Sequence, residues 1–237
     1  MAVYIYSITD KQHPLRLDGL SGVGESPAGL RAVTAGPLCA VVSDAPEDLR
    51  PKRRDIIAHQ EVQKRLMADG TVLPMRFGLI AENDEAILLA LEQNAADYTD
   101  RLQVLEGCTE YHLKASQDED ALLRQILQES DVARELNEEI RGGTADPDTS
   151  LQLGELVAQE VQARQEALAA GVVEALRPFA RTLETSQPTG SDFINVSFLV
   201  TEEQEEAFVT SELSVAHQMG DDFDFRLNGP LPPYSFV

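Results

Sequence analysis

The pattern of hydrophobic and polar positions near the start of the chain predicts β-strands. Residues 3–7 alternate in polarity, and two further apolar runs cover 30–34 and 38–43. The two runs are separated by Ala35-Gly36-Pro37, a turn sequence, so they predict a β-hairpin. The segment 20–27, which precedes the hairpin, has the composition of a loop.

Helical spacing of apolar residues begins after the hairpin. A helix is predicted over 54–68, and a short buried strand over 71–75. The apolar stripe of this helix consists of Ile56, His59, Val62 and Leu66. A second helix is expected to begin at the capping residue Asn83 and to end at Gly107. These elements predict an N-terminal α+β domain over 1–107.

The rest of the chain, 108–237, is predicted to be a C-terminal α+β domain that contains a helical insertion over about 116–186. A strand is expected over 109–115. Ser116 and Glu119 have the spacing of a capping box ahead of the first helix of the insertion.

A long helix is expected to dominate this insertion. It follows a glycine-rich and proline-containing break over 141–148, and it is predicted to begin at about Leu151. Its apolar stripe continues to Leu183, and Pro178 is expected to kink it. An amphipathic helix of this length is usually a packing element, although such a helix also forms or fills binding grooves.

The remaining elements of the C-terminal domain are two strands and one helix. A turn is predicted over 186–190 and a strand over 193–201. Thr201 and Gln204 have capping-box spacing ahead of the helix, and a last strand is expected over 223–227. The fold class is therefore α+β with two domains, and the sequence contains no internal repeat.

The C-terminal tail, Gly229–Val237, is unusual because it is apolar, aromatic and rich in proline. Chain ends are more often polar and frayed. Proline fixes φ and removes a hydrogen-bond donor, so the tail cannot join a helix or a central strand. We interpret it as a strap on the protein's own surface, with Tyr234 and Phe236 as anchors, or as a peptide offered to a partner.

Composition restricts the classes of protein to consider. The 237 residues are 43% hydrophobic, which is enough for a sizeable core, and the formal net charge of −22 disfavours binding to nucleic acid. No apolar run approaches the roughly 20 residues that span a bilayer. The N-terminus lacks signal-peptide features, so a cytoplasmic protein is expected. Cys39 and Cys108 have no metal or redox spacing and are predicted to be inert thiols.

His59 is the best candidate for catalysis, yet it lies on an apolar helical stripe without a second ligand at suitable spacing. A hydrogen-bonded, semi-buried histidine is the favoured interpretation. The other histidines, His13, His112 and His217, are scattered. Gly22-Val23-Gly24 is too short for a phosphate loop. The acidic group Glu202, Glu203, Glu205 and Glu206 is typical of a solvated helix start. We therefore predict no metal, no cofactor and no enzymatic activity.

Arg76 and Phe77 directly follow the predicted strand 71–75. The guanidinium of Arg76 is expected to pair with a carboxylate, and an acid of this same acidic chain is favoured over one on a partner. Phe77 is predicted to be either a core residue or part of a contact surface.

Several segments resemble the gas vesicle protein F/L family. The tail is similar to the family's C-terminal signature, and 59–62 together with 70–78 is similar to its helix and Leu-Pro-Leu-Arg-Phe-Gly-type strand and turn. The first strand and 38–43 also match. The departures are Met75, where leucine is common, and Leu231, where an aromatic residue is common.

This resemblance implies two α+β domains, of which at least one has a modified ferredoxin-like fold. It also implies a gas vesicle accessory protein that binds the hydrophobic major shell protein and other accessory proteins during assembly, in the cytoplasm and at the vesicle. Two alternatives stay open. One is a minor structural component of the vesicle wall without a chaperone role, and the other is an enzyme whose site assembles only in space.

Overall fold

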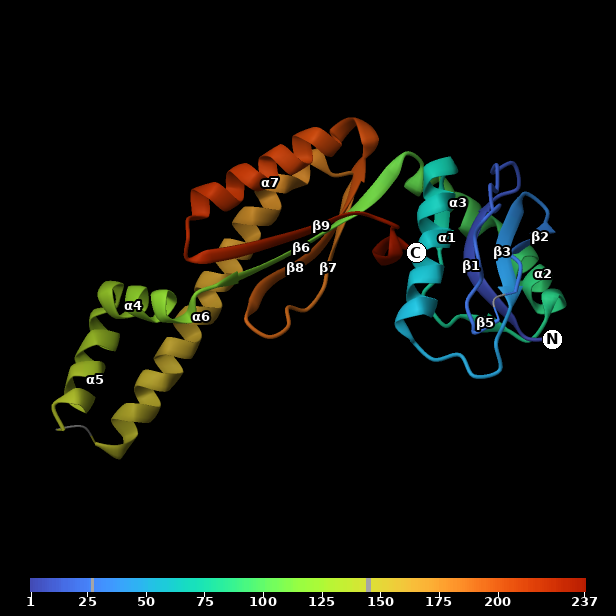
Figure 1. Ribbon diagram of the computed structural model, residues 1–237. Helices are drawn as coiled ribbons and strands as arrows, with labels where there is room; N and C mark the ends of the chain where they lie inside the picture. Colours follow the sequence, from blue (N-terminus) through green and yellow to red (C-terminus); the bar gives the residue numbers. More distant parts are fainter. Residues whose placement is uncertain (27, 144–145) are drawn as a thin grey trace. The chain divides into compact units, whose positions relative to one another are not determined.

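The computed structural model describes residues 1–26, 28–143 and 146–237, and it divides into two compact units (Figure 1). The N-terminal unit consists of Met1–Tyr111 together with the tail, Gly229–Val237. The C-terminal unit consists of His112–Asn228. The sequence placed the tail in the C-terminal domain, but in the structure its contacts assign it to the N-terminal unit.

The N-terminal unit contains an antiparallel sheet with the strand order β2-β3-β1-β4, and β5 also pairs with β1. Its strands are β1 (Val3–Asp10), β2 (Arg31–Ala35), β3 (Leu38–Asp44), β4 (Val72–Pro74) and β5 (Ile80–Ala81). The expected hairpin is β2–β3, and Gly36 occupies its turn with φ of 56°. Six of the seven residues of β3 are buried, because helices cover both faces of the sheet.

Three helices pack on this sheet, namely α1 (Arg53–Asp69), α2 (Asp84–Gln93) and α3 (Ala95–Leu105). Asn83 caps α2 as predicted, since its side chain accepts a hydrogen bond from the Ala86 N–H. The single helix expected over 83–107 is instead two helices that meet at Asn94. The Asn94 side chain donates to the Ala90 carbonyl there, which competes with continuation of the helix.

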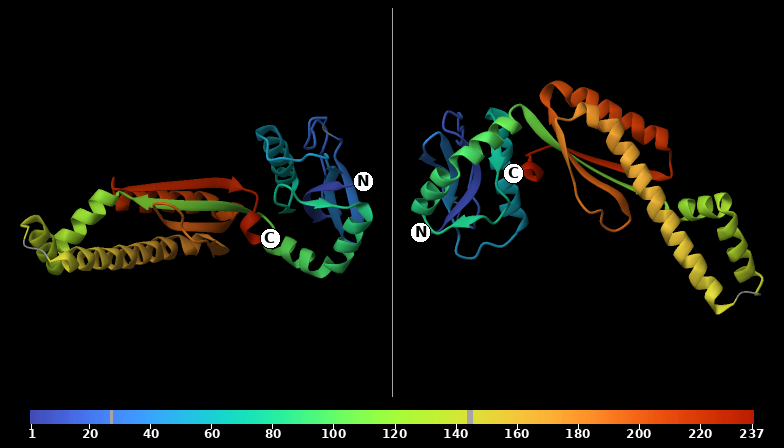
Figure 2. Two further views of the ribbon diagram at one scale, coloured as in Figure 1. Left: turned by 90° about the horizontal axis from the view of Figure 1, so that it is seen from below. Right: turned by 180° about the vertical axis from the view of Figure 1, so that it is seen from behind.

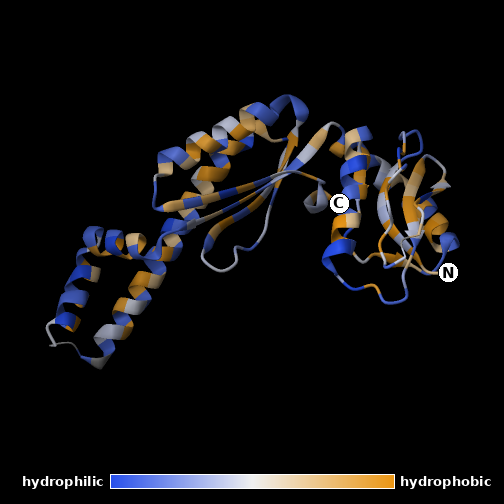
Figure 3. Cartoon of the chain, in the orientation of Figure 1, coloured by the Kyte–Doolittle hydropathy of each residue, from blue (hydrophilic) through white to orange (hydrophobic). Residues whose placement is uncertain are grey.

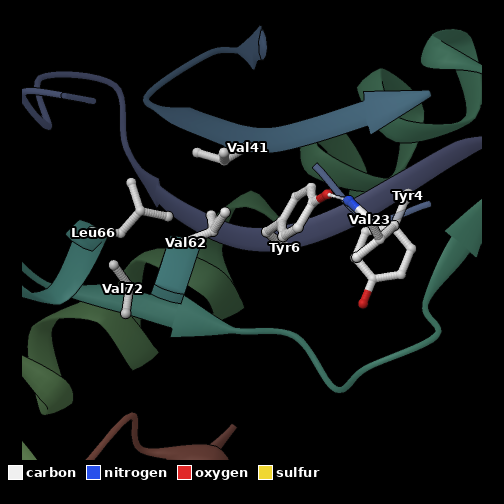
Figure 4. Close-up of a cluster of buried hydrophobic side chains, with 7 residues drawn as sticks. All are labelled: Tyr4, Tyr6, Val23, Val41, Val62, Leu66 and Val72. Atoms are coloured by element: carbon white, nitrogen blue, oxygen red, sulfur yellow. Dashed lines mark hydrogen bonds between the residues drawn. The ribbon is translucent and has the colours of Figure 1, made fainter. Parts of the chain in front are cut away.

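A cluster of buried side chains joins α1 to the sheet (Figure 4). It is formed by Tyr4, Tyr6, Val23, Val41, Val62, Leu66 and Val72. Val62 and Leu66 come from the predicted apolar stripe of α1, so the helical spacing of the sequence identified the correct face. Figure 3 shows the same concentration of hydrophobic residues along the strands of this unit.

The C-terminal unit is built on a second antiparallel sheet with the order β7-β8-β6-β9. Its elements are β6 (Cys108–Gln117), α4 (Glu119–Glu129), α5 (Asp131–Arg141), α6 (Pro147–Leu176), η1 (Arg177–Phe179), β7 (Thr182–Thr185), β8 (Asp192–Thr201), η2 (Glu202–Gln204), α7 (Glu205–Met219) and β9 (Phe223–Leu231). The tail ends in a short 3-10 turn, η3 (Tyr234–Phe236). β6 and β9 cross the boundary between the units.

Both sheets have the same strand order, in which the third strand lies between the first and the second and the fourth pairs with the first. This order is compatible with ferredoxin-like units. The ferredoxin-like assignment nevertheless stays a prediction. In the N-terminal unit, no helix separates β1 from β2 among the described residues.

The helical insertion forms an antiparallel arm in the C-terminal unit. Figure 2 shows that α6 runs along the sheet and continues beyond it to α4 and α5. The buried contacts of the arm are Leu122, Ile126 and Ala133, which pack against the apolar side of α6.

Several predicted helix ends in this unit need correction. Asp118, and not Ser116, caps α4, because Ser116 still belongs to β6. Thr201 forms no side-chain cap, since the 3-10 turn η2 precedes α7. Pro178 does not kink a longer helix. α6 ends at Leu176, Pro178 lies in η1, and Leu183 belongs to β7. The predicted loop 20–27 and break 141–148 each extend over positions outside the described residues.

Candidate functional site

His59 lies at the centre of an aromatic cluster in the N-terminal unit. It is on the core face of α1, and only 2% of its surface is exposed. The rings of Tyr4 and Tyr6 lie 5.7 Å from its ring, centroid to centroid, and the ring of Phe77 lies at 5.8 Å. His59 is thus more deeply buried than the semi-buried residue that the sequence predicted.

Both ring nitrogens of His59 have polar neighbours. The Gly78 N–H donates to Tyr4 Oη at 3.2 Å, and Tyr4 Oη lies 2.8 Å from His59 Nδ1. His59 Nε2 lies 3.3 Å from Tyr234 Oη and 3.4 Å from Gln63 Nε2. Burial lowers the pKa of His59 to about 4, although a hydrogen bond with the Met75 backbone partly opposes this effect. The imidazole is therefore neutral at pH 7.

Polar groups around the cluster are also paired. Tyr6 Oη accepts a hydrogen bond from the Val23 N–H at 2.8 Å and lies 3.0 Å from Ser43 Oγ. Gln63 bridges two further groups, since it accepts from the Ser7 hydroxyl and donates to the Tyr6 carbonyl. Burial raises the pKa of Tyr4 and of Tyr6, so both hydroxyls stay protonated. This network of paired polar groups orders the core of the N-terminal unit.

The tail reaches this cluster through defined contacts. Glu110 is 4% exposed, and its two carboxylate oxygens accept from Ser235. The backbone N–H binds Oε2 at 2.9 Å and the hydroxyl binds Oε1 at 2.7 Å. Tyr234 meets His59, and burial raises the pKa of Tyr234 to about 12. Figure 1 shows the corresponding turn η3 beside α1.

Gly229 completes the fit of the tail, because its backbone lies directly against the Tyr111 ring. A Cβ atom at this position would lie 2.3 Å from Tyr111 Cδ1, which is far inside van der Waals contact. Tyr111 is itself buried. Phe236, the second predicted anchor, is half-buried within η3, and its N–H donates to the Pro233 carbonyl at 3.1 Å.

Arg76 and Phe77 have different environments although they are neighbours. Phe77 is half-buried, and its ring packs on Tyr4 and His59. Arg76 is exposed, and within the described part of the chain its guanidinium forms no ion pair. The internal carboxylate that the sequence favoured as its partner is thus not found there. Leu79 and Ile80 follow in the same segment, and each is 43% exposed.

The other candidate residues are dispersed. Cys39 is buried and Cys108 is half-buried, and neither forms a disulfide. His13 donates to the Leu66 carbonyl at 3.0 Å, while His217 is exposed on α7. His112 Nε2 lies 2.6 Å from Asn195 Oδ1. Gly22-Val23-Gly24 is held by Tyr6 and Asp55 rather than open to a phosphate. Across residues 1–26, 28–143 and 146–237, no three potential metal ligands converge.

Sequence reasoning did not find Tyr4, Glu110, Tyr111 or the contact role of Gly229. The alternation along the predicted strand gave no signal for the burial of Glu110, since it shares a face with His112 and Lys114, opposite to the buried Tyr111, Leu113 and Ala115. Its partner Ser235 is 125 residues away, and no local pattern connects the two.

Arg76→Lys is expected to leave the melting temperature within about 2 °C of the wild type, since an exposed side chain without an ion pair contributes little to stability. If Arg76 binds a partner's carboxylate, the same substitution weakens that complex, because lysine lacks the planar fork. Thermal unfolding and affinity for the shell protein are measured on the same variant. A large drop in melting temperature would show that Arg76 has a structural role.

Comparison with known proteins gives consistent results over the whole chain. The family described as "Gas vesicle synthesis protein GvpL/GvpF" matches residues 2–237. "Gas vesicle protein F" of a Streptomyces species is 41% identical over the full length of both chains. "Gas vesicle protein L1" of Halobacterium salinarum is 28% identical and covers 99% of this chain and 89% of its own.

The fold also matches a solved structure. The crystal structure of GvpF from Anabaena sp. PCC7120 superimposes with a TM-score of 0.86 at 23% sequence identity, covering 99% of this chain and 97% of the other. Among the described helices, none has both the length and the hydropathy needed to cross a bilayer.

Proposed function

Since the chain belongs to the gas vesicle synthesis protein GvpL/GvpF family, we propose that it is an accessory protein of gas vesicle formation which binds the hydrophobic major shell protein and other accessory proteins. The observation that carries this proposal is the family match over 2–237, together with 41% identity to a gas vesicle protein F over both full lengths. We further propose that it acts in the cytoplasm, at the growing vesicle.

The physical properties of the chain suit this task. A shell protein that is not yet part of the wall exposes apolar surface, and such surface aggregates. A binding partner must cover that surface and keep the complex dispersed. The net charge of −22 supplies the repulsion between complexes.

We propose that the contact segment includes 76–80. Leu79 and Ile80 offer exposed apolar side chains there, and Arg76 has a guanidinium without an ion pair among the described residues. The segment is held in place by Phe77, which packs into the aromatic cluster. A segment with a fixed backbone and with exposed apolar and cationic groups is suited to bind a partner surface that carries both apolar and charged groups.

A gene deletion tests whether the protein is needed for vesicle formation. We expect the deletion strain to lose most of its vesicles and the wild-type gene to restore them. Unchanged vesicle yield in the deletion strain, with no second gene of the same family present, would contradict the proposal.

The abundance of this protein in purified vesicles distinguishes a minor wall component from a transient accessory protein. A transient accessory protein is expected to be depleted from vesicles that are washed extensively. A constant stoichiometric amount that resists washing would favour a structural role in the wall.

The enzyme alternative depends on His59, and GvpL/GvpF proteins are not a known enzyme family. Because both ring nitrogens of His59 face tyrosine hydroxyls in the core, we expect His59→Gln to support vesicle formation at no less than about half of the wild-type yield, provided that the protein level is matched. A complete loss of vesicles with a folded variant would revive the enzyme hypothesis.

A further inference from the structure

A pocket of about 360 Å³ lies where three elements of the N-terminal unit end. The strand β1 ends at Asp10, α1 ends at Asp69, and α3 ends at Leu105, which Glu106 follows. The three acids Asp10, Asp69 and Glu106 all line the pocket, and none of the described residues that line it is a lysine or an arginine. The wall of the pocket therefore carries carboxylates without a cation of its own.

Both helices place an acid at the end where a helix favours a cation. The C-terminal end of a helix carries a partial negative charge, because its last carbonyls have no partner within the helix. Asp69 is the last residue of α1 and Glu106 is the C-cap of α3, and the last turn of each helix, all of it described, contains no basic residue. The helix ends and the carboxylates thus add to the same negative potential, which a bound cation would lower.

Asp69 is incompletely paired although it is buried. Only 6% of its side chain is exposed. Its Oδ1 lies 3.3 Å from Nη1 of Arg16, whose side chain is 73% exposed, and an ion pair with so exposed a partner contributes little to stability. Its Oδ2 is buried and has no hydrogen-bond partner among the described residues. A buried acceptor without a donor costs free energy, so a ligand that brings N–H donors to Asp69 would be stabilised.

His13 lines the same pocket but does not neutralise it. The Leu15 N–H donates to His13 Nδ1 at 3.2 Å, and His13 Nε2 donates to the Leu66 carbonyl at 3.0 Å. Since Nδ1 accepts a hydrogen bond, only Nε2 carries a proton and the imidazole is uncharged. Both ring nitrogens are occupied within the fold. Within the described parts of the chain, the acids of the pocket also do not converge as ligands of one metal ion.

We propose that this pocket binds a linear polyamine, which is a chain of ammonium groups separated by apolar methylene segments. Carboxylates that surround a pocket without meeting at one point suit a ligand with several separated charges. Each ammonium group supplies the N–H donors that Asp69 lacks. Leu102 and Pro14 line the pocket as well and offer apolar surface to the methylene segments. The volume is within the range of roughly 300–1,000 Å³ that is typical of small-ligand sites. This inference does not depend on the proposed function.

Calorimetric titration of the full-length protein with spermidine tests the proposal. The titration is done at a fixed, roughly physiological ionic strength, where interactions with distant surface charges are screened. We expect one spermidine to bind per chain, and we expect Mg²⁺ at the same ionic strength not to displace it. Nα-acetyl-lysine amide, which carries a single ammonium group, should bind at least about tenfold more weakly. If capped lysine binds as tightly as spermidine, or if Mg²⁺ displaces spermidine, the proposal of a polyamine site is wrong.

Asp69→Asn locates the binding site, because asparagine keeps the shape of the side chain and removes its charge. The affinity for spermidine is expected to fall about tenfold. The melting temperature of the free protein should stay the same or rise by about 2 °C, because an acid is removed from a helix C-terminus. Asp48→Asn removes an exposed carboxylate of the same unit and is the matched control, for which we expect an affinity within about twofold of the wild type.

An equal loss of affinity in both variants would show that spermidine responds only to the net charge of the chain, and it would overturn the site. Glu106→Gln provides an independent test at the end of the second helix, and it decides the matter if Asp69→Asn does not fold. We expect this variant to bind spermidine several-fold more weakly than the wild type. An unchanged affinity in Glu106→Gln together with an unchanged affinity in a folded Asp69→Asn would also overturn the proposal.

Discussion

Gly229→Ala is expected to lower the melting temperature of the protein by about 8 °C, which is a large effect for the addition of one methyl group. The new Cβ atom would lie 2.3 Å from Cδ1 and 2.9 Å from Cγ of Tyr111, which is buried, so either the ring or the tail backbone must shift. We expect the tail to shift. Glu110 then loses two hydrogen bonds from Ser235, each of which involves a charged acceptor. The steric overlap and the two lost hydrogen bonds together lower the free energy of unfolding by about 3 kcal/mol. A loss of this size corresponds to a drop of about 8 °C in the melting temperature.

Gly29→Ala is the matched control for this substitution. Gly29 lies in the same unit, and a Cβ atom there would meet no heavy atom within 4 Å. We expect its melting temperature to change by no more than about 1 °C. Equal melting temperatures for the two alanine variants would show that the contact between the tail and Tyr111 does not contribute to stability.

The stability of the protein is expected to depend on pH through His59. The pKa of His59 is about 4 in the folded protein, whereas its ordinary value, which applies to the unfolded chain, is 6.5. The unfolded chain therefore binds the proton more tightly. The stabilisation by neutral His59 is therefore complete above pH 6.5 and is lost as the pH falls through 4. The difference between 6.5 and about 4 corresponds to about 3 kcal/mol.

His59→Gln isolates this contribution from the many carboxylates that titrate in the same range. Denaturant unfolding of wild type and variant is measured at pH 7 and at pH 4. The stability advantage of the wild type should shrink by about 3 kcal/mol at the lower pH. His217→Gln changes an exposed histidine on α7 and serves as the control. An advantage that is the same at both pH values would mean that burial does not disfavour protonated His59.

Local patterns predicted most of the elements near the site. The stripe that contains His59, Val62 and Leu66 identified the buried face of α1, because helical periodicity follows directly from burial on one side. The Asn83 cap and the hairpin β2–β3 were predicted correctly, because each is determined by residues that lie close together in the sequence.

Local sequence patterns could not predict the contacts between segments that lie far apart in the sequence. Glu110 meets Ser235 and Gly229 meets Tyr111 only because β6 and β9 belong to one sheet, and no sequence period encodes that pairing. The break at Asn94 was missed because the apolar stripe continues across it. The favoured internal partner of Arg76 was inferred from the excess of acids, but composition does not determine which acid is within reach.

Co-expression with the major gas vesicle shell protein tests the central claim most directly. The measurement is the amount of shell protein in the soluble fraction and its co-purification with this chain through an affinity tag. We predict that the chain raises soluble shell protein several-fold and co-purifies with it, while an unrelated acidic protein of similar charge does neither. Shell protein that stays insoluble and does not co-purify, although this chain is folded and abundant, would contradict the proposed function.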